Sequence, residues 1–152
     1  MHIPVIIGGI IEGPFVGATI GLIFGVTSLW QALTNPVGTA VFFMNPLVSI
    51  LPRILIGIIA YYVYKGLYKI TKKVYASGFM AGLIGSLANT AGVLGMIYIL
   101  YADQYINLIG EAGANAGKLL FTLAATNGIP ESLVAGLVVS AVSVALIRKG
   151  KK

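Results

Sequence analysis

Long apolar stretches, separated by short polar breaks, make up most of the chain. They predict helices over five segments: 3–11, 13–33, 48–68, 77–101 and 130–147. At 1.5 Å per residue, the last four can cross a hydrocarbon core about 30 Å thick, whereas the first reaches only ~14 Å. The pattern therefore predicts an all-α, polytopic helical membrane protein, with a single integral membrane domain over residues 1–152.

The breaks between these segments contain turn and loop signals. Residues 34–48 include two Asn-Pro pairs and are expected to form a loop. Residues 69–76 form a second loop, which is rich in lysine. Residues 102–128 are more polar than their surroundings, and within them residues 117–125 are apolar enough for a short helix.

The composition excludes most soluble classes of protein. Hydrophobic residues make up 58% of the chain and charged residues 9%, against roughly 25% charged residues in a typical soluble domain. The chain is also too apolar to be disordered. With no cysteine, one histidine and four acidic residues, it offers no thiolate metal site and little for a catalytic centre. We therefore expect no catalytic residues, no metal and no cofactor, and the sequence has no phosphate-binding loop with which to use ATP.

The net charge of +6 is concentrated in two places. Four lysines lie between residues 65 and 73, and four basic residues lie at 148–152. Each cluster follows a long apolar segment, so the positive-inside rule predicts that both face the cytoplasm of a cell-membrane protein, and that neither binds nucleic acid. Counting segments back from there leaves Met1 outside, before a segment too short to span. We therefore expect a further helix upstream of Met1.

Four glycines, Gly13, Gly17, Gly21 and Gly25, repeat at intervals of four residues. On a helix this spacing makes a stripe without side chains, along which another helix can approach closely. The stripe is interpreted either as packing within the chain's own bundle or as a docking surface for another membrane subunit.

Arg53 is the only arginine outside the C-terminal cluster, and it follows Pro52 at the start of an apolar helix. A charge at membrane depth needs an anionic partner or access to water. Because a guanidinium suits two-pronged recognition of a carboxylate or a phosphate, we favour a role in ligand binding. The alternatives are snorkelling to the headgroups and pairing with Glu131.

Three amides and one hydroxyl are further candidates for a polar site. Asn89 lies in the middle of an apolar helix, where it either holds helices together or binds a polar ligand. Asn127 opens the last predicted helix and is placed to close over a ligand. Asn45 and Ser49 border the loop at 34–48.

Four stretches of the chain resemble one known family. They are residues 3–25 (IPVIIGGIIEGPFVGATIGLIFG), 45–57 (NPLVSILPRILIG), 86–90 (SLANT) and 127–131 (NGIPE). In this order they resemble the second and third helices, the start of the fourth, and parts of the fifth and sixth helices of S components. S components are the substrate-binding membrane subunits of energy-coupling factor (ECF) vitamin transporters. The pattern is most similar to the pantothenate-type members.

The resemblance implies a six-helix fold with both ends in the cytoplasm, and the family's first helix has no counterpart in this chain. It implies that the protein captures a vitamin from outside and delivers it inward with a T component and two ATPases, which use the ATP. Carried onto this chain, Arg53 would pair with the ligand carboxylate. Asn89 and Asn127 would serve its hydroxyls and amide, and Asn45 and Ser49 would help to gate the site.

Two alternatives remain open from the sequence alone. One is the same family with another vitamin, such as riboflavin or folate. The other is a structural or assembly subunit of a membrane complex, which would use the glycine stripes and bind no small molecule. An intramembrane enzyme would need paired carboxylates or a His/Ser set at one depth, and the sequence has neither.

Overall fold

The computed structural model describes residues 2–109 and 115–149, and all regular structure in these ranges is helical, which confirms the predicted fold class. The elements are α1 (Ile3–Glu12), α2 (Pro14–Thr34), the 3₁₀ segment η1 (Gly38–Met44), α3 (Pro46–Ser49), α4 (Leu51–Thr71), α5 (Val74–Ile109), α6 (Ala116–Leu123), the π-helical segment η2 (Ala124–Gly128) and α7 (Ile129–Lys149). Four stretches are long and apolar enough to cross a membrane: Pro14–Thr34, Pro46–Thr71, Val74–Asn107 and Gly117–Ile147.

Proline begins four of these helices. Pro4, Pro14, Pro46 and Pro52 lie in the first turns of α1, α2, α3 and α4, where a missing backbone N–H breaks no helical hydrogen bond. Gly13 separates α1 from α2 with a φ of 102°, a conformation that residues with a side chain rarely adopt. The apolar run at the start of the chain is therefore divided into a helical hairpin.

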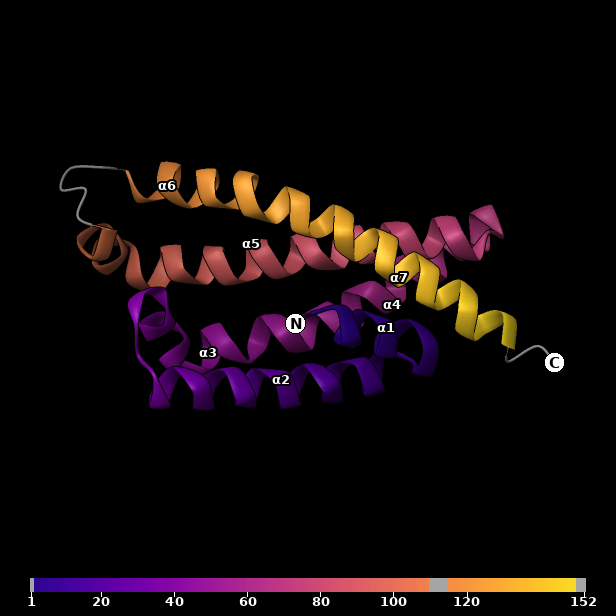
Figure 1. Ribbon diagram of the computed structural model, residues 1–152, viewed down its shortest axis with the longest axis horizontal. Helices are drawn as coiled ribbons and strands as arrows, with labels where there is room; N and C mark the ends of the chain where they lie inside the picture. The colour runs from indigo at the N-terminus through magenta and orange to yellow at the C-terminus, as the bar shows by residue number, and fades with distance from the viewer. Residues whose placement is uncertain (1, 110–114, 150–152) are drawn as a thin grey trace.

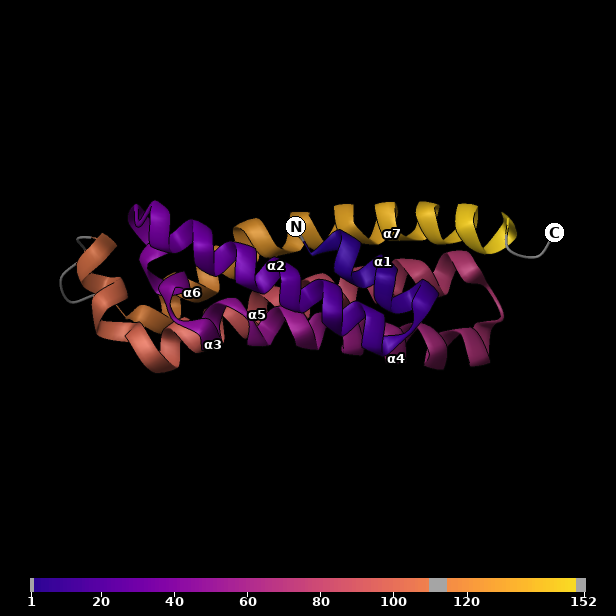
Figure 2. The same ribbon diagram turned by 90° about the horizontal axis from the view of Figure 1, so that it is seen from below.

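The long helices lie side by side along one axis in two layers (Figures 1 and 2). One layer contains α1, α2 and α4, and the other contains α5, α6 and α7. The layers meet mainly where α4 packs on α5 and α1 packs on α7, and within the described residues α2 contacts neither α5 nor α7. We call the end with Gly13, Lys72 and the end of α7 the basic end, and the end with η1, α3 and the start of α6 the loop end.

Glycines allow the closest helix contacts in both layers. A Cβ added to Gly17 of α2 would lie 2.7 Å from the Cα of Gly9 in α1 and 3.1 Å from the Cα of Gly57 in α4. A Cβ on Gly82 of α5 would lie 2.8 Å from the Cα of Gly136 in α7. These distances leave no room for a side chain, so small residues are required at both contacts.

The repeat along α2 continues this contact toward the loop end. A Cβ on Gly21 would collide with the backbone oxygen of Arg53, and one on Gly25 would lie 2.7 Å from the Cα of Ile50. Together with Gly17, these glycines lie inside the bundle, against helices of the same chain. Gly13, the first member of the repeat, lies in the α1–α2 turn with open space beside it.

Two apolar cores lie toward the two ends of the bundle. The core nearer the basic end joins α1, α4, α5 and α7 and contains Val5, Ile6, Ile10, Ile56, Ala60, Tyr64, Ala81 and Val139. The core at the loop end joins η1, α3, α5 and α6 and contains Phe42, Val48, Val93, Ile97, Tyr105 and Leu120. Because α1 has only ten residues and lies in the half toward the basic end, none of the described helices fills the space between α2 and the α6–α7 span in the other half (Figures 1 and 2).

The stretch 102–128 is more helical than the sequence predicts. α5 continues to Ile109 beyond a non-helical residue, Tyr101 (φ −139°, ψ 23°), where the predicted helix ended. Asn115 caps the start of α6, since its side chain accepts a hydrogen bond from the Gly117 N–H at 2.9 Å, and η2 joins α6 to α7. Pro130 has no N–H to donate, and the wider turn of η2 just before it lets the helix continue past this point.

Candidate functional site

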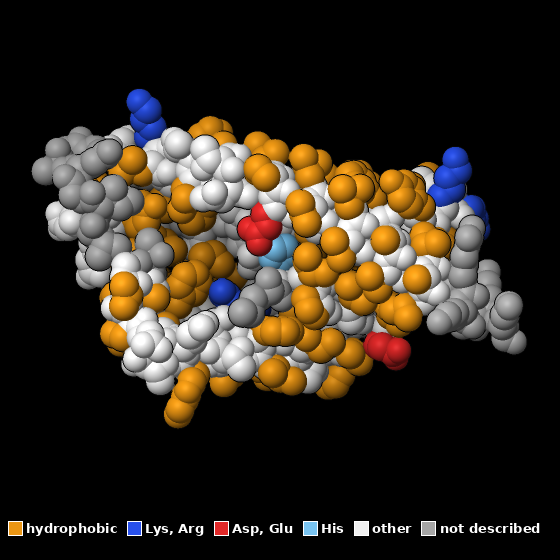
Figure 3. All heavy atoms as spheres, in the orientation of Figure 1, with side chains coloured by type: hydrophobic (Ala, Val, Ile, Leu, Met, Phe, Trp, Pro, Cys, Tyr) orange, Lys and Arg blue, Asp and Glu red, His pale blue; other side chains and the backbone are white. Residues whose placement is uncertain are grey.

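The unfilled space between the layers forms a hollow on one face of the bundle. Figure 3 shows this hollow with a basic side chain at its floor and a histidine beside an acidic group at its edge. Its part nearest the loop end, which we call the loop cavity, has a volume of about 570 Å³. The loop cavity is lined by Ser28, Gln31, Ala32, Asn35, Ala40, Phe43 and Arg53.

Two smaller cavities adjoin the same arginine. The central cavity, of about 190 Å³, is lined by His2, Val5, Phe24, Arg53, Asn89 and Glu131. The α5–α7 cavity, of about 210 Å³, is lined by Phe43, Arg53, Asn89, Thr90, Val93, Leu94, Leu123, Asn127, Gly128 and Glu131. Arg53 borders all three cavities and therefore marks the centre of the candidate site.

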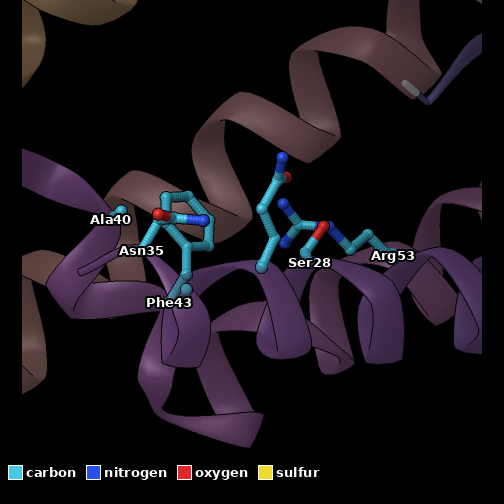
Figure 4. A pocket seen from close by; sticks show the side chains of 7 residues that line it. Ser28, Asn35, Ala40, Phe43 and Arg53 are labelled. Carbon is cyan, nitrogen blue, oxygen red and sulfur yellow. The ribbon is translucent and has the colours of Figure 1, made fainter. Parts of the chain in front are cut away.

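Arg53 lies in the first turn of α4 and is held by the short helices before it. Its Nη1 donates to the backbone oxygens of Ser49 at 2.8 Å and Val48 at 3.2 Å, and its guanidinium carbon lies 5.1 Å from the centre of the Phe43 ring. Figure 4 shows Arg53 and Phe43 bordering the loop cavity from α4 and η1, with Ser28 of α2 on the same cavity. A guanidinium has five N–H donors, so this arrangement orients the side chain and leaves donors for an anion.

The predicted alternative in which Arg53 pairs with Glu131 is not observed. Among the described residues, no carboxylate oxygen lies within 4 Å of Arg53. Glu131 instead contacts the histidine at the start of α1, with Oε1 3.4 Å from His2 Nδ1. The two charged side chains thus border the same cavities without neutralising each other directly.

Asn89 and Asn127 approach the α5–α7 cavity from opposite helices. Asn89 belongs to α5, and its Oδ1 is buried with no hydrogen-bond partner among the described residues. Asn127 belongs to the π-helical segment η2, and its neighbour Gly128 packs against the Thr90 side chain, where an added Cβ would lie 3.0 Å from Cγ2. The structure therefore brings Arg53, Asn89 and Asn127 to one cavity, although 74 positions separate the first from the last.

Asn45 and Ser49 border none of the three cavities. Asn45 caps α3 by accepting from the Leu47 N–H at 3.0 Å, and its Nδ2 lies 3.0 Å from the Tyr101 hydroxyl. Ser49 is fully buried and donates to the backbone oxygen of Phe43. Both residues hold the segment from η1 to α3, which formed the predicted loop, against the end of the bundle.

The structure adds three residues that the sequence did not single out for the site: Gln31, Phe43 and His2. Gln31 has the one side-chain amide in the apolar α2 sequence, so this amide could have marked it as a candidate site residue. Phe43 and His2 gave no such signal, because an aromatic residue in a loop and a histidine before a helix are both common. Glu131 was considered as a possible partner of Arg53, and its place in the wall of two cavities was not predicted.

The arrangement suits the binding of a small polar anion. Its positive charge comes from one oriented guanidinium, and amide groups from other helices surround it. Cavities of 300–1,000 Å³ with a few converging polar groups are typical of small-molecule sites.

Comparison with known proteins identifies the family of the chain. Residues 1–147 match the family model described as "ECF transporter, substrate-specific component". The chain is 30% identical over 162 aligned residues to the pantothenic acid transporter PanT of Lactococcus lactis subsp. cremoris, covering 97% of this chain and 76% of that protein. It is also 30% identical over 148 residues to the pantothenate transporter PanT of Leuconostoc mesenteroides, covering 94% and 72%. This chain is therefore a multi-pass membrane protein of the family of substrate-specific (S) components of ECF transporters, which are transport subunits and not enzymes.

Proposed function

We propose that this S component captures pantothenate from outside the cell. The observation on which the proposal rests is the oriented Arg53 guanidinium, which borders three adjoining cavities and has no carboxylate partner among the described residues. The two relatives, both named as pantothenate transporters, support the choice of substrate.

The chemistry of pantothenate fits the side chains around the cavities. The vitamin has a carboxylate at one end, an amide in the middle and two hydroxyls at the other end. The carboxylate binds Arg53, and the amide groups of Asn89 and Asn127 bind the remaining polar groups. The loop cavity of about 570 Å³ is large enough for a ligand of this class.

The proposed transport direction follows from the position of the basic residues. The loop between α4 and α5 contains Lys72 and Lys73, so by the positive-inside rule the basic end and the C-terminus face the cytoplasm. The loop cavity then faces outward. ECF S components pair with T and ATPase subunits, and we propose that this chain delivers its vitamin with one T component and two ATPases that use the ATP.

Removal of the guanidinium tests the proposal. We expect Arg53→Ala to weaken binding of radiolabelled pantothenate to the detergent-purified protein by tenfold or more, because hydrogen bonds to charged groups contribute about 1.5–3 kcal/mol. Lys118→Ala is a matched control, since it removes an exposed positive charge from α6 without changing the cavity. Riboflavin, folate and thiamine serve as competitors.

Each result of this titration has a distinct meaning. Saturable pantothenate binding that is lost in Arg53→Ala and kept in Lys118→Ala would support the proposal. Displacement by another vitamin would keep the site and change the substrate. Binding of none of these vitamins to well-folded protein would contradict the proposal and favour an assembly subunit.

A further inference from the structure

Glu131 occupies an unusual position in the candidate site. It lies in the first turn of α7 and borders both the central cavity and the α5–α7 cavity, as Arg53 does. Its one ion-pair partner within the described ranges is His2, at 3.4 Å, and the carboxylate side chain remains 51% exposed. A carboxylate that is neither buried nor fully paired in a cavity wall remains available to a ligand.

Glu131 and Asn89, which border these cavities, therefore carry acceptors without sufficient donors, and His2 Nε2 at the central cavity is also buried without a partner in the described ranges. An ionised carboxylate can only accept hydrogen bonds. The Oδ1 of Asn89 is also an acceptor, and it is buried without a partner in the described part of the chain. Leaving a buried acceptor unsatisfied is unfavourable, so a ligand that brings donors to this place gains affinity from them.

The opposite charges of Glu131 and Arg53 determine which end of a ligand binds where. The negative charge of Glu131 repels a ligand carboxylate, whereas Arg53 attracts it, and Arg53 also borders the loop cavity, which Glu131 does not. The carboxylate of the ligand is therefore directed to the loop-cavity side of Arg53. The end with hydroxyl or amide donors is then directed toward α5 and α7.

We infer that Glu131, together with Asn89 Oδ1, recognises the hydroxyl groups of the substrate and makes the protein selective for hydroxylated acids over their deoxy analogues. This inference rests on the proposed function and adds a specificity-determining residue to it. A site built to hydrogen-bond a hydroxyl discriminates strongly against a ligand that lacks it, because the polar groups of the site are then left unpaired.

Ligand analogues test the inference without any change to the protein. The experiment compares the affinity of wild-type protein for pantothenate with its affinity for analogues in which one or both hydroxyls are replaced by hydrogen. We expect the analogue without hydroxyls to bind at least tenfold more weakly. Equal affinities for both ligands would overturn the inference.

Two charge-removing variants assign the discrimination to Glu131. In Glu131→Gln the ratio of the two affinities is expected to fall at least threefold, because a neutral amide oxygen is a weaker acceptor than a carboxylate. Glu12→Gln, which removes an exposed carboxylate at the basic end, is expected to keep the wild-type ratio. An unchanged ratio in Glu131→Gln would overturn the role of Glu131, and equal wild-type affinities for the two ligands would overturn the inference even if that variant does not fold.

Failure of the inference is distinguishable from failure of the proposed function. Pantothenate binding that depends on Arg53 but does not distinguish the deoxy analogues would remove the inference and leave the proposed function intact. No pantothenate binding to wild-type protein would overturn both.

Discussion

Single side chains at the loop end connect segments that lie far apart in the sequence. Asn45 Nδ2 lies 3.0 Å from the Tyr101 hydroxyl, and Tyr101 is the residue at which α5 departs from helical geometry. The ring of Phe42 lies 5.4 Å from that of Tyr101 and 5.8 Å from that of Tyr105. These contacts hold η1, and with it the Phe43 ring beside Arg53, against α5.

Tyr101→Phe tests this connection, since it removes the hydroxyl and keeps the aromatic contact. We expect the variant to lose about 0.5–1.5 kcal/mol of stability, the usual net contribution of one hydrogen bond. Thermal unfolding of the purified protein in detergent measures the change. Tyr98→Phe is the control, because Tyr98 is exposed and forms no side-chain hydrogen bond in the described structure. Equal unfolding midpoints for the two variants would show that the Asn45–Tyr101 bond contributes nothing.

At the residue scale, the sequence alone could point to two of the residues that border the cavities. A lone arginine and a lone asparagine in apolar helices are expensive in a membrane, so their positions point to a site without any knowledge of the fold. Arg53 and Asn89 both border the cavities. Asn45 instead forms a hydrogen bond with the Tyr101 hydroxyl, and Ser49 forms one with a backbone oxygen. Their position near a predicted loop could not show whether they contact a ligand or the protein itself.

At the scale of the elements, close packing of glycine-rich helices positions the site. Gly21 of α2 lies directly against the backbone of Arg53, so the position of α4, and with it the guanidinium, depends on the absence of a side chain there. A four-residue spacing predicts such a stripe, but it does not say which helix lies against it.

Gly21→Leu is expected to destabilise the protein by about 1–3 kcal/mol or more, because the new side chain would overpack the α2–α4 contact. It should also weaken ligand binding by displacing Arg53. Gly66→Leu makes the same change in α4 at a glycine with open space around it, and it should behave as wild type. Unfolding midpoints measure the change in stability and pantothenate titration measures the change in binding, and wild-type behaviour of Gly21→Leu in both would rule out this contact as the determinant of the Arg53 position.

The π-helical segment η2 is the element that the sequence predicted least well. The sequence places Asn127, Gly128 and Pro130 close together, which indicates a loop before a helix. In the structure α6 and α7 form one span from Gly117 to Ile147, and η2 lies inside it. Helix packing against α5 keeps this stretch helical, and single π turns within helices are frequent at functional sites.

At the scale of the whole molecule, the two layers determine where the cavities lie. The apolar cores at the two ends are well packed, and the polar groups gather between them, where α1 no longer separates α2 from α7. The proposed direction of transport depends on which end of this bundle faces the cytoplasm.

Cysteine labelling tests that orientation, because this chain has no cysteine of its own. In intact cells, a membrane-impermeant maleimide should label Lys118→Cys at the loop end. It should label Lys73→Cys, between α4 and α5, only after the cells are permeabilised. The opposite pattern would invert the proposed topology and place the loop cavity toward the cytoplasm.

The sequence by itself determined the class of fold, the approximate spans and the arginine of the candidate site. These features depend on local properties, namely apolar length, proline at helix starts, and the cost of a charge in lipid. Only the tertiary structure decided that Gly17 and Gly21 face α1 and α4 and that Gly25 faces the α3–α4 junction. It also decided that Glu131 contacts His2 and not Arg53, and that Asn127 lies in a π turn. The physical reason is that each of these features depends on contacts between helices distant in the sequence, and such contacts leave no local pattern in the chain.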